Sequence, residues 1–179
     1  MADEVGLPLI IFTLQPALGG TDFSDETLLR LIEIPEVVAI KEALFDAKRF
    51  REIVGVVRSA PRRITVLTGN DNFIWESYLL GADGALLGAC ATCAQTHARV
   101  HEAAMRGDWH TARELGDRIQ KVVDALFAPP VRDYRARSKE ILVMQGIIKH
   151  AHMRPPLLSV GPEDRQALKK ALEEAGELQ

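Results

Sequence analysis

In the first half of the chain, short apolar runs alternate with segments whose apolar residues recur at helical spacing. The apolar runs are rich in β-branched and small residues and are bounded by Gly, Pro, Asn or Asp, as is typical of buried strands. These runs are Leu7–Leu14, Val37–Ala43, Ile64–Thr68 and Gly84–Ala89. The amphipathic segments between them are Ser24–Ile34, in which Ser24 is the expected N-cap, Phe45–Ser59 and Phe73–Leu80. This alternation with short loops predicts an α/β fold with a parallel sheet and crossover helices.

Beyond Thr92 the pattern becomes wholly helical, with Gly-Asp and Pro-Pro pairs between the segments. The predicted helices are Thr96–Met105, Trp109–Phe127, Tyr134–Ile148 and Pro162–Glu174. We expect one continuous domain, in which residues 1–93 form the βα units and residues 94–179 form helices that pack on them.

Composition restricts the class of protein and its partners. The chain has 179 residues, 47% of them hydrophobic, and a net charge of −3, which suits one domain with a sizeable core. Without a basic run, nucleic acid and anionic membranes are not expected as partners. The stretch Met1–Gly6 is acidic and lacks the basic region of a signal peptide. Two cysteines give no disulfide framework and suit a reducing cytoplasm, the expected location.

The strand Val37–Ala43 contains a lysine, Lys41, in an otherwise apolar run. Burial disfavours an ammonium ion and makes the amine a usable nucleophile, and such amines form Schiff bases with carbonyl substrates. The alternative is a lysine at the mouth of the strand that reaches water or pairs with Glu42.

Other candidate site residues follow the ends of the strands, where sites of parallel α/β proteins lie. Phe12 and Thr13 end the first strand, and Gly69-Asn70-Asp71 follows the third. The alternative for the second group is a polar turn in which Asn70 or Asp71 caps the next helix.

Cys90 and Cys93 have the spacing of a redox dithiol, but two small buried residues are the better interpretation. The five histidines, in polar helical stretches, fit no metal site and are expected to be solvated, and Arg132, Arg135 and Arg137 are expected on a helix face. No metal or other cofactor is expected.

Five motifs together resemble the dihydrodipicolinate synthase / N-acetylneuraminate lyase family of class I aldolases. They are Leu-Pro-Leu-Ile-Ile-Phe at 7–12, Leu-x-x-Leu-x-x-Ile-Pro-x-Val-Val-Ala-Ile-Lys-Glu-Ala at 28–43, Leu-Thr-Gly-Asn-Asp at 67–71, Gly-Ala-Asp-Gly-Ala-Leu-Leu-Gly at 81–88 and Met-Arg-Pro-Pro-Leu at 153–157. The likeness covers nearly the whole chain, and the Ile-Lys-Glu-Ala strand is its most specific part.

The resemblance implies the C-terminal half of a (β/α)8 TIM barrel, strands five to eight, followed by a helical segment. The first four βα units and their Gly-Thr-Thr loop, which binds the substrate carboxylate in the family, are then missing. The implied activity is a Schiff-base lyase or dehydratase that acts on a 2-oxo acid such as pyruvate and belongs to a homo-oligomer. A truncated family member is therefore expected.

Residue by residue, the resemblance makes Lys41 the Schiff-base lysine. Phe12 stands where most members carry a proton-relaying tyrosine, so the site is either that of a subfamily or inactive. Thr13 and Gly69 would line the substrate site, and Asn70 and Asp71 match a loop that contacts the distal part of the substrate. The resemblance also implies that the backbone of Leu86 would lie beside the pyruvyl group of the substrate.

Two further observations leave alternatives open. Residues 16–20 read Pro-Ala-Leu-Gly-Gly, without the arginine of members that make the lysine precursor. The main rival to an enzyme is a non-catalytic half-barrel that serves as a structural or interaction subunit. A doubly wound, receiver-like domain would need an acidic pocket after Leu14, and the sequence shows none.

Overall fold

A computed structural model describes residue 4 and residues 6–178 of the chain. Residues 1–3 and 5, which belong to the stretch where no signal peptide is expected, lie outside the described residues. The chain forms two compact units, each described here by itself. The first comprises the chain up to Leu87 together with Ala104–Gly107, and the second comprises Gly88–Ala103 together with the chain from Asp108.

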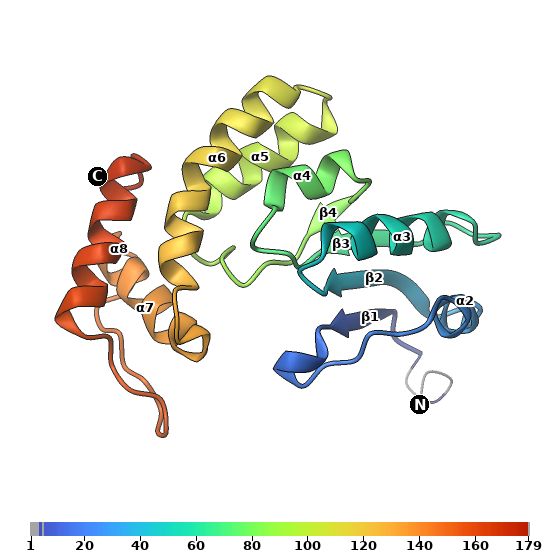
Figure 1. Ribbon diagram of the computed structural model, residues 1–179, viewed down its shortest axis with the longest axis horizontal. Coiled ribbons are helices and arrows are strands. Elements are labelled where there is room, and N and C mark those ends of the chain that lie inside the picture. Colours follow the sequence, from blue (N-terminus) through green and yellow to red (C-terminus); the bar gives the residue numbers. More distant parts are fainter. Residues whose placement is uncertain (1–3, 5, 179) are drawn as a thin grey trace. The chain divides into compact units, whose positions relative to one another are not determined.

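The first unit is built on a four-stranded parallel sheet (Figure 1). Its strands are β1 (Leu9–Leu14), β2 (Val37–Ala43), β3 (Thr65–Thr68) and β4 (Gly84–Ala85). They lie in the order β1-β2-β3-β4. Because this order never reverses, the sheet lacks the switch point of a doubly wound fold. Four sequential parallel strands with crossover helices fit a partial TIM barrel.

Strand boundaries differ from the prediction at the sheet's edges. The second strand has the expected bounds, whereas β1 begins two residues late, after Pro8, and β4 ends at Ala85 rather than Ala89. The early end of β4 follows from its neighbour, because β3 stops at Thr68. The Leu86 N–H still bonds the Thr68 carbonyl at 2.8 Å, and β3 offers no ladder partner beyond it.

Helices α2 (Asp25–Ile32), α3 (Ala47–Arg58) and α4 (Ile74–Leu79) connect the strands. The Ser24 hydroxyl accepts the N–H of Thr27 at 3.2 Å, which confirms the predicted N-cap of α2. The helix expected from Phe45 begins instead at Ala47, because the Asp46 carboxylate caps its first turn.

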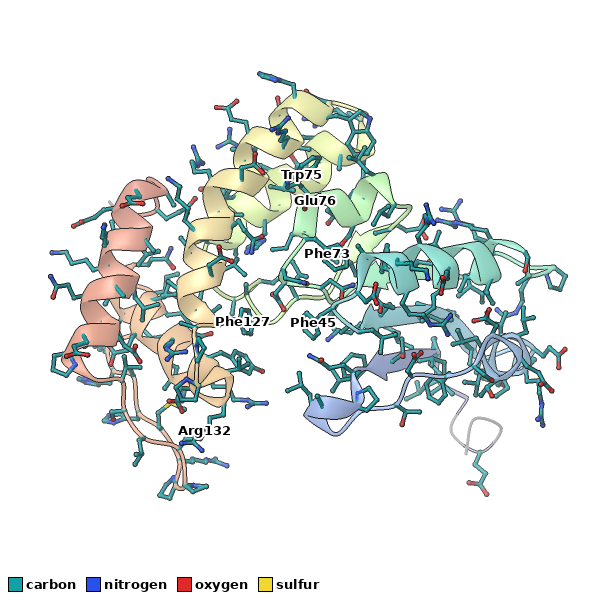
Figure 2. The ribbon with its side chains drawn as sticks, viewed as in Figure 1. Phe45, Phe73, Trp75, Glu76, Phe127 and Arg132 are labelled. Atoms are coloured by element: carbon teal, nitrogen blue, oxygen red, sulfur yellow. The ribbon has the colours of Figure 1, made fainter. Side chains whose placement is uncertain are left out.

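The core of the first unit lies between the sheet and these helices. Phe50 of α3 is fully buried, and its ring meets the ring of Phe73 edge-on with the centroids 6.1 Å apart. Phe73 lies just before α4 (Figure 2). Tyr78 is buried as well, and the buried aliphatic side chains of this unit include Leu28, Ile32, Ile40, Ile53, Val57, Ile64 and Val66. Packing of the helices on one face of the sheet therefore supplies the apolar burial of this unit.

The second unit is helical, with α5 (Ala94–Met105, the end of which belongs to the first unit), α6 (Trp109–Leu126), α7 (Tyr134–Met144) and α8 (Pro162–Glu174). Arg137, expected on a helix face, is buried: it donates to the carbonyls of Ala128 and Pro129 and pairs with Asp164 at 3.1 Å. A buried arginine needs such partners for its five donors. None of the described helices is long and apolar enough to cross a membrane.

Candidate active site

Lys41 lies on the face of the sheet opposite to Glu42, since successive side chains of a strand alternate. In register it stands between Phe12 of β1 and Leu67 of β3. Its side chain is half-buried. The Glu42 carboxylate accepts hydrogen bonds on the other face, so the suggested Lys41–Glu42 pair does not fit this geometry.

The ring of Phe12 covers the end of the lysine. The Lys41 ammonium nitrogen lies 4.2 Å from the ring centroid, within the range of a cation–π interaction. The face of an aromatic ring carries partial negative charge, so it attracts a cation held at this point. Phe12 thus offers electrostatic stabilisation but has no hydroxyl that could relay a proton.

Gly69 gives the lysine side chain the space it occupies. A Cβ at this position would lie 2.7 Å from Cε of Lys41 and 2.8 Å from Cβ of Ala43. Both distances are shorter than van der Waals contact allows, so any larger residue at Gly69 would displace the lysine. The glycine of the Gly-Asn-Asp motif is therefore explained by the close approach of a side chain.

Behind the lysine, a buried network ties the loop after β2 to the loop after β3. The fully buried Glu42 carboxylate accepts the Leu44 N–H at 2.8 Å and an Asn70 amide N–H at 2.5 Å. The Asn70 side-chain oxygen in turn accepts the Phe45 N–H at 2.8 Å. Burial raises the pKa of Glu42, and the hydrogen bonds from Asn70 and Leu44 oppose that shift in part.

The network holds a strained residue next to the lysine strand. Phe45 (Figure 2) has φ +61°, a conformation that bulky residues rarely adopt. Such strain persists only where surrounding bonds fix it, and it is common at active sites. The Asn70 hydrogen bond supplies this restraint.

The remaining predicted site residues differ in their burial and in the direction of their side chains. The Thr13 side chain is fully buried, and its hydroxyl donates to the Thr21 carbonyl at 2.9 Å, so it is turned away from the lysine face. Asp71 is buried, whereas Leu86 is 50% exposed just beyond β4. The structure brings Phe12, Lys41 and Gly69 into contact, and Asn70 acts through the network behind them.

Sequence reasoning missed the part played by Glu42. Its carboxylate directly follows the lysine in an apolar strand, and that position was the available signal, since buried carboxylates need partners. The partner, Asn70, lies 28 positions away, and only the fold brings the two together.

The two cysteines differ in burial, since Cys90 is half-buried and Cys93 is buried. Cys93 is buried, and burial, with the nearby Glu177 carboxylate, raises the pKa of its thiol to about 12. A thiol that stays protonated is a poor nucleophile, in agreement with the interpretation of Cys93 as a small buried residue, whereas Cys90 is more exposed than that interpretation predicts.

The expectation of solvated histidines is wrong for His97. This side chain is buried, and desolvation lowers its pKa to about 4. A neutral imidazole avoids the cost of a buried charge. Among the described residues, no cluster of His, Cys, Asp and Glu could hold a metal ion.

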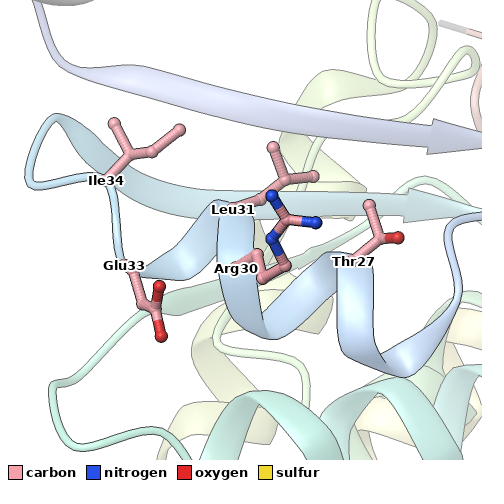
Figure 3. A pocket seen from close by; sticks show the side chains of 5 residues that line it. All are labelled: Thr27, Arg30, Leu31, Glu33 and Ile34. Carbon is pink, nitrogen blue, oxygen red and sulfur yellow. The ribbon is translucent and has the colours of Figure 1, made fainter.

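The structure also has a pocket of about 530 Å³ on the side of α2 (Figure 3). It is lined by Thr27, Arg30, Leu31, Glu33 and Ile34. None of the predicted site residues lines it, so this pocket is separate from the candidate site around Lys41.

Comparison with known proteins shows to which family the chain is similar. The sequence model of the dihydrodipicolinate synthetase family matches residues 1–175. A 4-hydroxy-tetrahydrodipicolinate synthase of Koribacter versatilis is 30% identical over 178 residues, which are 99% of this chain and 57% of the relative. One of Thermodesulfovibrio yellowstonii is 31% identical over 98% of this chain and 58% of its own length. The chain therefore spans little more than half the length of these relatives.

Solved structures of related proteins share the fold of this chain over somewhat more than half of their own length. A chloride-inhibited dihydrodipicolinate synthase from Acinetobacter baumannii, complexed with pyruvate, superposes with a TM-score of 0.81 at 30% identity. It is covered to 58% by 99% of this chain. A monomeric dihydrodipicolinate synthase variant superposes with a TM-score of 0.89 at 22% identity, which speaks for the fold alone.

Proposed function

Because the chain belongs to the dihydrodipicolinate synthetase family, we propose that it carries the Schiff-base half of a lyase or dehydratase that acts on 2-oxo acids. In this proposal its strands are the fifth to eighth of the barrel, and Lys41 is the reacting lysine. The observation that carries the proposal is the set of contacts around Lys41: a phenyl ring at 4.2 Å and a glycine that leaves room for the side chain.

The proposed reaction begins with attack of the neutral Lys41 amine on the carbonyl carbon of the 2-oxo acid. The nitrogen forms a bond to that carbon, the carbonyl oxygen leaves as water with one proton from the amine and one proton from solvent, and a protonated iminium remains. The iminium withdraws electrons and stabilises the carbanion that forms when a neighbouring bond breaks. The Phe12 ring, beside the nitrogen, favours this cation.

The other predicted site residues have different roles in the proposal. Gly69 provides space for the lysine, and Leu86 borders the face on which the substrate would lie. Asn70 acts by positioning the loops, and Asp71 keeps its proposed place near the distal part of the substrate. For Thr13, whose side chain points away, only the backbone is available to a ligand.

Specific synthesis of the lysine precursor is not part of the proposal. The residues after β1, Pro16–Leu18 and the two glycines that follow, lack an arginine, and Phe12 cannot relay a proton. Addition of the 2-oxo acid to a different aldehyde, or elimination of water from the substrate in place of any addition to an aldehyde, agrees better with these residues. The cytoplasm, suggested by the two free cysteines, and a homo-oligomer complete the proposal.

A non-catalytic role remains the second candidate, and one observation favours it: the face that carries Lys41 is open, with Phe12 45% exposed. Water at an iminium competes with the intended reaction, so an uncovered site is a poor catalyst. The two candidates make opposite predictions for trapping of a substrate on Lys41.

Incubation with pyruvate and borohydride, followed by mass spectrometry, tests the proposal. The chain is used alone and together with the part of the Koribacter versatilis relative that it does not match. We expect a reduced adduct on Lys41 and none in Lys41→Arg, because a guanidinium is not a usable amine nucleophile. Labelling of Lys139 or Lys169 instead, or no labelling in either preparation, would favour the non-catalytic role.

A further inference from the structure

Toward the C-terminal ends of the strands, the side chains that share the face of Lys41 are apolar. Phe12 and Leu67 flank the lysine in register on the neighbouring strands. Leu14 lies on the same face two residues beyond Phe12, because side chains alternate along a strand. We call Phe12, Leu14, Leu67 and Leu86 the apolar surface. None of the four is buried, so a molecule attached to Lys41 would meet them.

Leu86 belongs to this surface because of the way β4 packs beside β3. A Cβ on Gly84 would lie 3.1 Å from Cδ2 of Leu67, so Gly84 faces the same side as Leu67. Two residues later Leu86 faces this side again, and its N–H bonds the Thr68 carbonyl at 2.8 Å. The apolar surface therefore extends from β1 to the end of β4, with Lys41 between its members.

The polar side chains of the loop that passes Lys41 are already engaged. This loop begins at Gly69, where a Cβ would lie 2.7 Å from Cε of the lysine. The Asn70 amide donates to the Glu42 carboxylate at 2.5 Å, and its oxygen accepts the Phe45 N–H at 2.8 Å. Asp71, the next residue, is buried. The loop therefore presents its glycine, rather than the Asn70 amide, to a molecule on Lys41.

Charged side chains that follow the strands also have partners away from Lys41. Asp46 caps α3, where its carboxylate accepts the N–H groups of Lys48 and Arg49 at 2.8 and 3.1 Å. Asp22, in the segment after β1, pairs with Arg49 at 3.3 Å. A polar group held on the apolar surface would lose hydration without gaining a hydrogen bond from it, which costs free energy. An apolar group held there gains free energy, because both surfaces leave water.

We propose that the 2-oxo acid held by Lys41 carries an apolar, ring-bearing group beyond the carbon next to its carbonyl, and that the apolar surface selects this group; the inference rests on the function proposed above. An aromatic ring suits the surface best, since it can pack edge-on or offset against the ring of Phe12. Hydroxyl and carboxylate groups in the same place are disfavoured. Phe12 and Leu86, the two most exposed members, determine the specificity.

Three derivatives of pyruvate test the proposal. Benzylpyruvate, hydroxymethylpyruvate and 2-oxoglutarate carry a phenyl, a hydroxyl and a carboxylate group on the second carbon beyond the carbonyl. Each is incubated with cyanoborohydride and the two preparations used for pyruvate, and mass spectrometry gives the rate of labelling of Lys41. Division by the rate with Nα-acetyllysine removes differences in intrinsic reactivity. We expect benzylpyruvate to label Lys41 about tenfold faster than either polar derivative.

Variants show whether the apolar surface causes the preference. Phe12→Ser and Leu86→Ser, on different strands, should each reduce the ratio of benzylpyruvate to hydroxymethylpyruvate labelling by about threefold or more. Leu79→Ser, which replaces an exposed leucine of α4 outside the surface, is the matched control and should keep the ratio. The ratio compares two ligands on one variant, so a general loss of reactivity cancels.

Circular dichroism of each variant excludes unfolding, and either of the two variants suffices if the other is unfolded. Equal or faster labelling by a polar derivative, with pyruvate still trapped on Lys41, would overturn this inference and leave the proposed function standing. A ratio that Leu79→Ser reduces as much as Leu86→Ser would likewise overturn it. Labelling of Lys41 by none of these acids, pyruvate included, would overturn the inference and the proposed function together.

Discussion

The two faces of the four-stranded sheet differ in how completely they are covered. On the helix side, Ile40 and Val66 are fully buried beneath α2 and α3, and the buried Glu42 carboxylate has its hydrogen-bond donors. On the other side, Ile10 and Phe12 are about half exposed. Both faces are apolar, so apolar character alone does not show which of them the chain can bury by itself.

The difference teaches how stability and chemistry are divided in this unit. Cooperative stability should come from the helix side, because that is where apolar surface is removed from water. The side that carries Lys41 contributes little until another layer covers it. The network of Glu42 and Asn70 joins the two, since it fixes from the helix side the loops that flank the lysine.

The largest expected contrast comes from the same truncation made on each face. Phe50→Ala removes a fully buried ring and should lower the free energy of unfolding by about 3–5 kcal/mol. Phe12→Ala removes a half-exposed ring and should cost the isolated chain less than about 1 kcal/mol. Urea unfolding of both variants measures the contrast, and equal losses would show that the two faces are equally buried.

The next effect concerns the network. Glu42→Gln puts an amide donor opposite the Asn70 amide donor and should cost about 1–3 kcal/mol, as expected for buried unsatisfied groups. Adding Asn70→Asp restores an acceptor there while still accepting the Phe45 N–H, so the double variant should recover much of the loss. Additive losses in the double variant would refute the pairing.

Substitution of Gly69 tests the space around the lysine, and substitution of Gly55 is its control. Gly69→Ala forces Cε of Lys41 to move and should slow labelling of that lysine by an amine reagent. Gly55→Ala, in α3 with no atom within 4 Å of the new Cβ, is the control and should stabilise the chain by about 0.5–1 kcal/mol. Unchanged Lys41 labelling in Gly69→Ala would show that the close approach has no consequence.

The smallest expected effect is a dependence on pH. Since burial raises the pKa of Glu42, the folded chain binds this proton more tightly than the unfolded chain. Its contribution to stability is therefore fully present below the ordinary value of 4.5 and is lost as the pH rises through the raised pKa. Glu42→Gln should flatten this part of the curve, and an unchanged curve would assign the dependence to another group.

Much of the fold could be predicted from the sequence because its signals are local. The apolar β-branched run at Val37–Ala43 and the cap at Ser24 each depend on neighbouring residues, and both were predicted correctly. The end of β4 was not, because it depends on where the adjacent β3 stops. Burial of His97 and Arg137 was also missed: both lie in polar stretches, and Asp164, the ion-pair partner of Arg137, is distant in sequence.

The sequence predicted which residues belong to the candidate site, but not how their side chains are arranged. Lys41 is recognisable as a charged residue in an apolar strand. Gly69-Asn70-Asp71 is recognisable as a turn with two polar residues after the strand that ends at Thr68. Which side of a strand each residue faces follows from register, and so the turn of Thr13 away from the lysine face and the tie between Glu42 and Asn70 required the three-dimensional arrangement.

Hydroxyl-radical footprinting read by mass spectrometry tests the central claim, the difference between the two faces, most directly. Phe12 and Phe50 have the same intrinsic reactivity, so their oxidation rates compare exposure alone. The account predicts fast oxidation of Phe12, which is 45% exposed, and slow oxidation of Phe50, which is fully buried. Equal protection of both rings in the chain alone would contradict it.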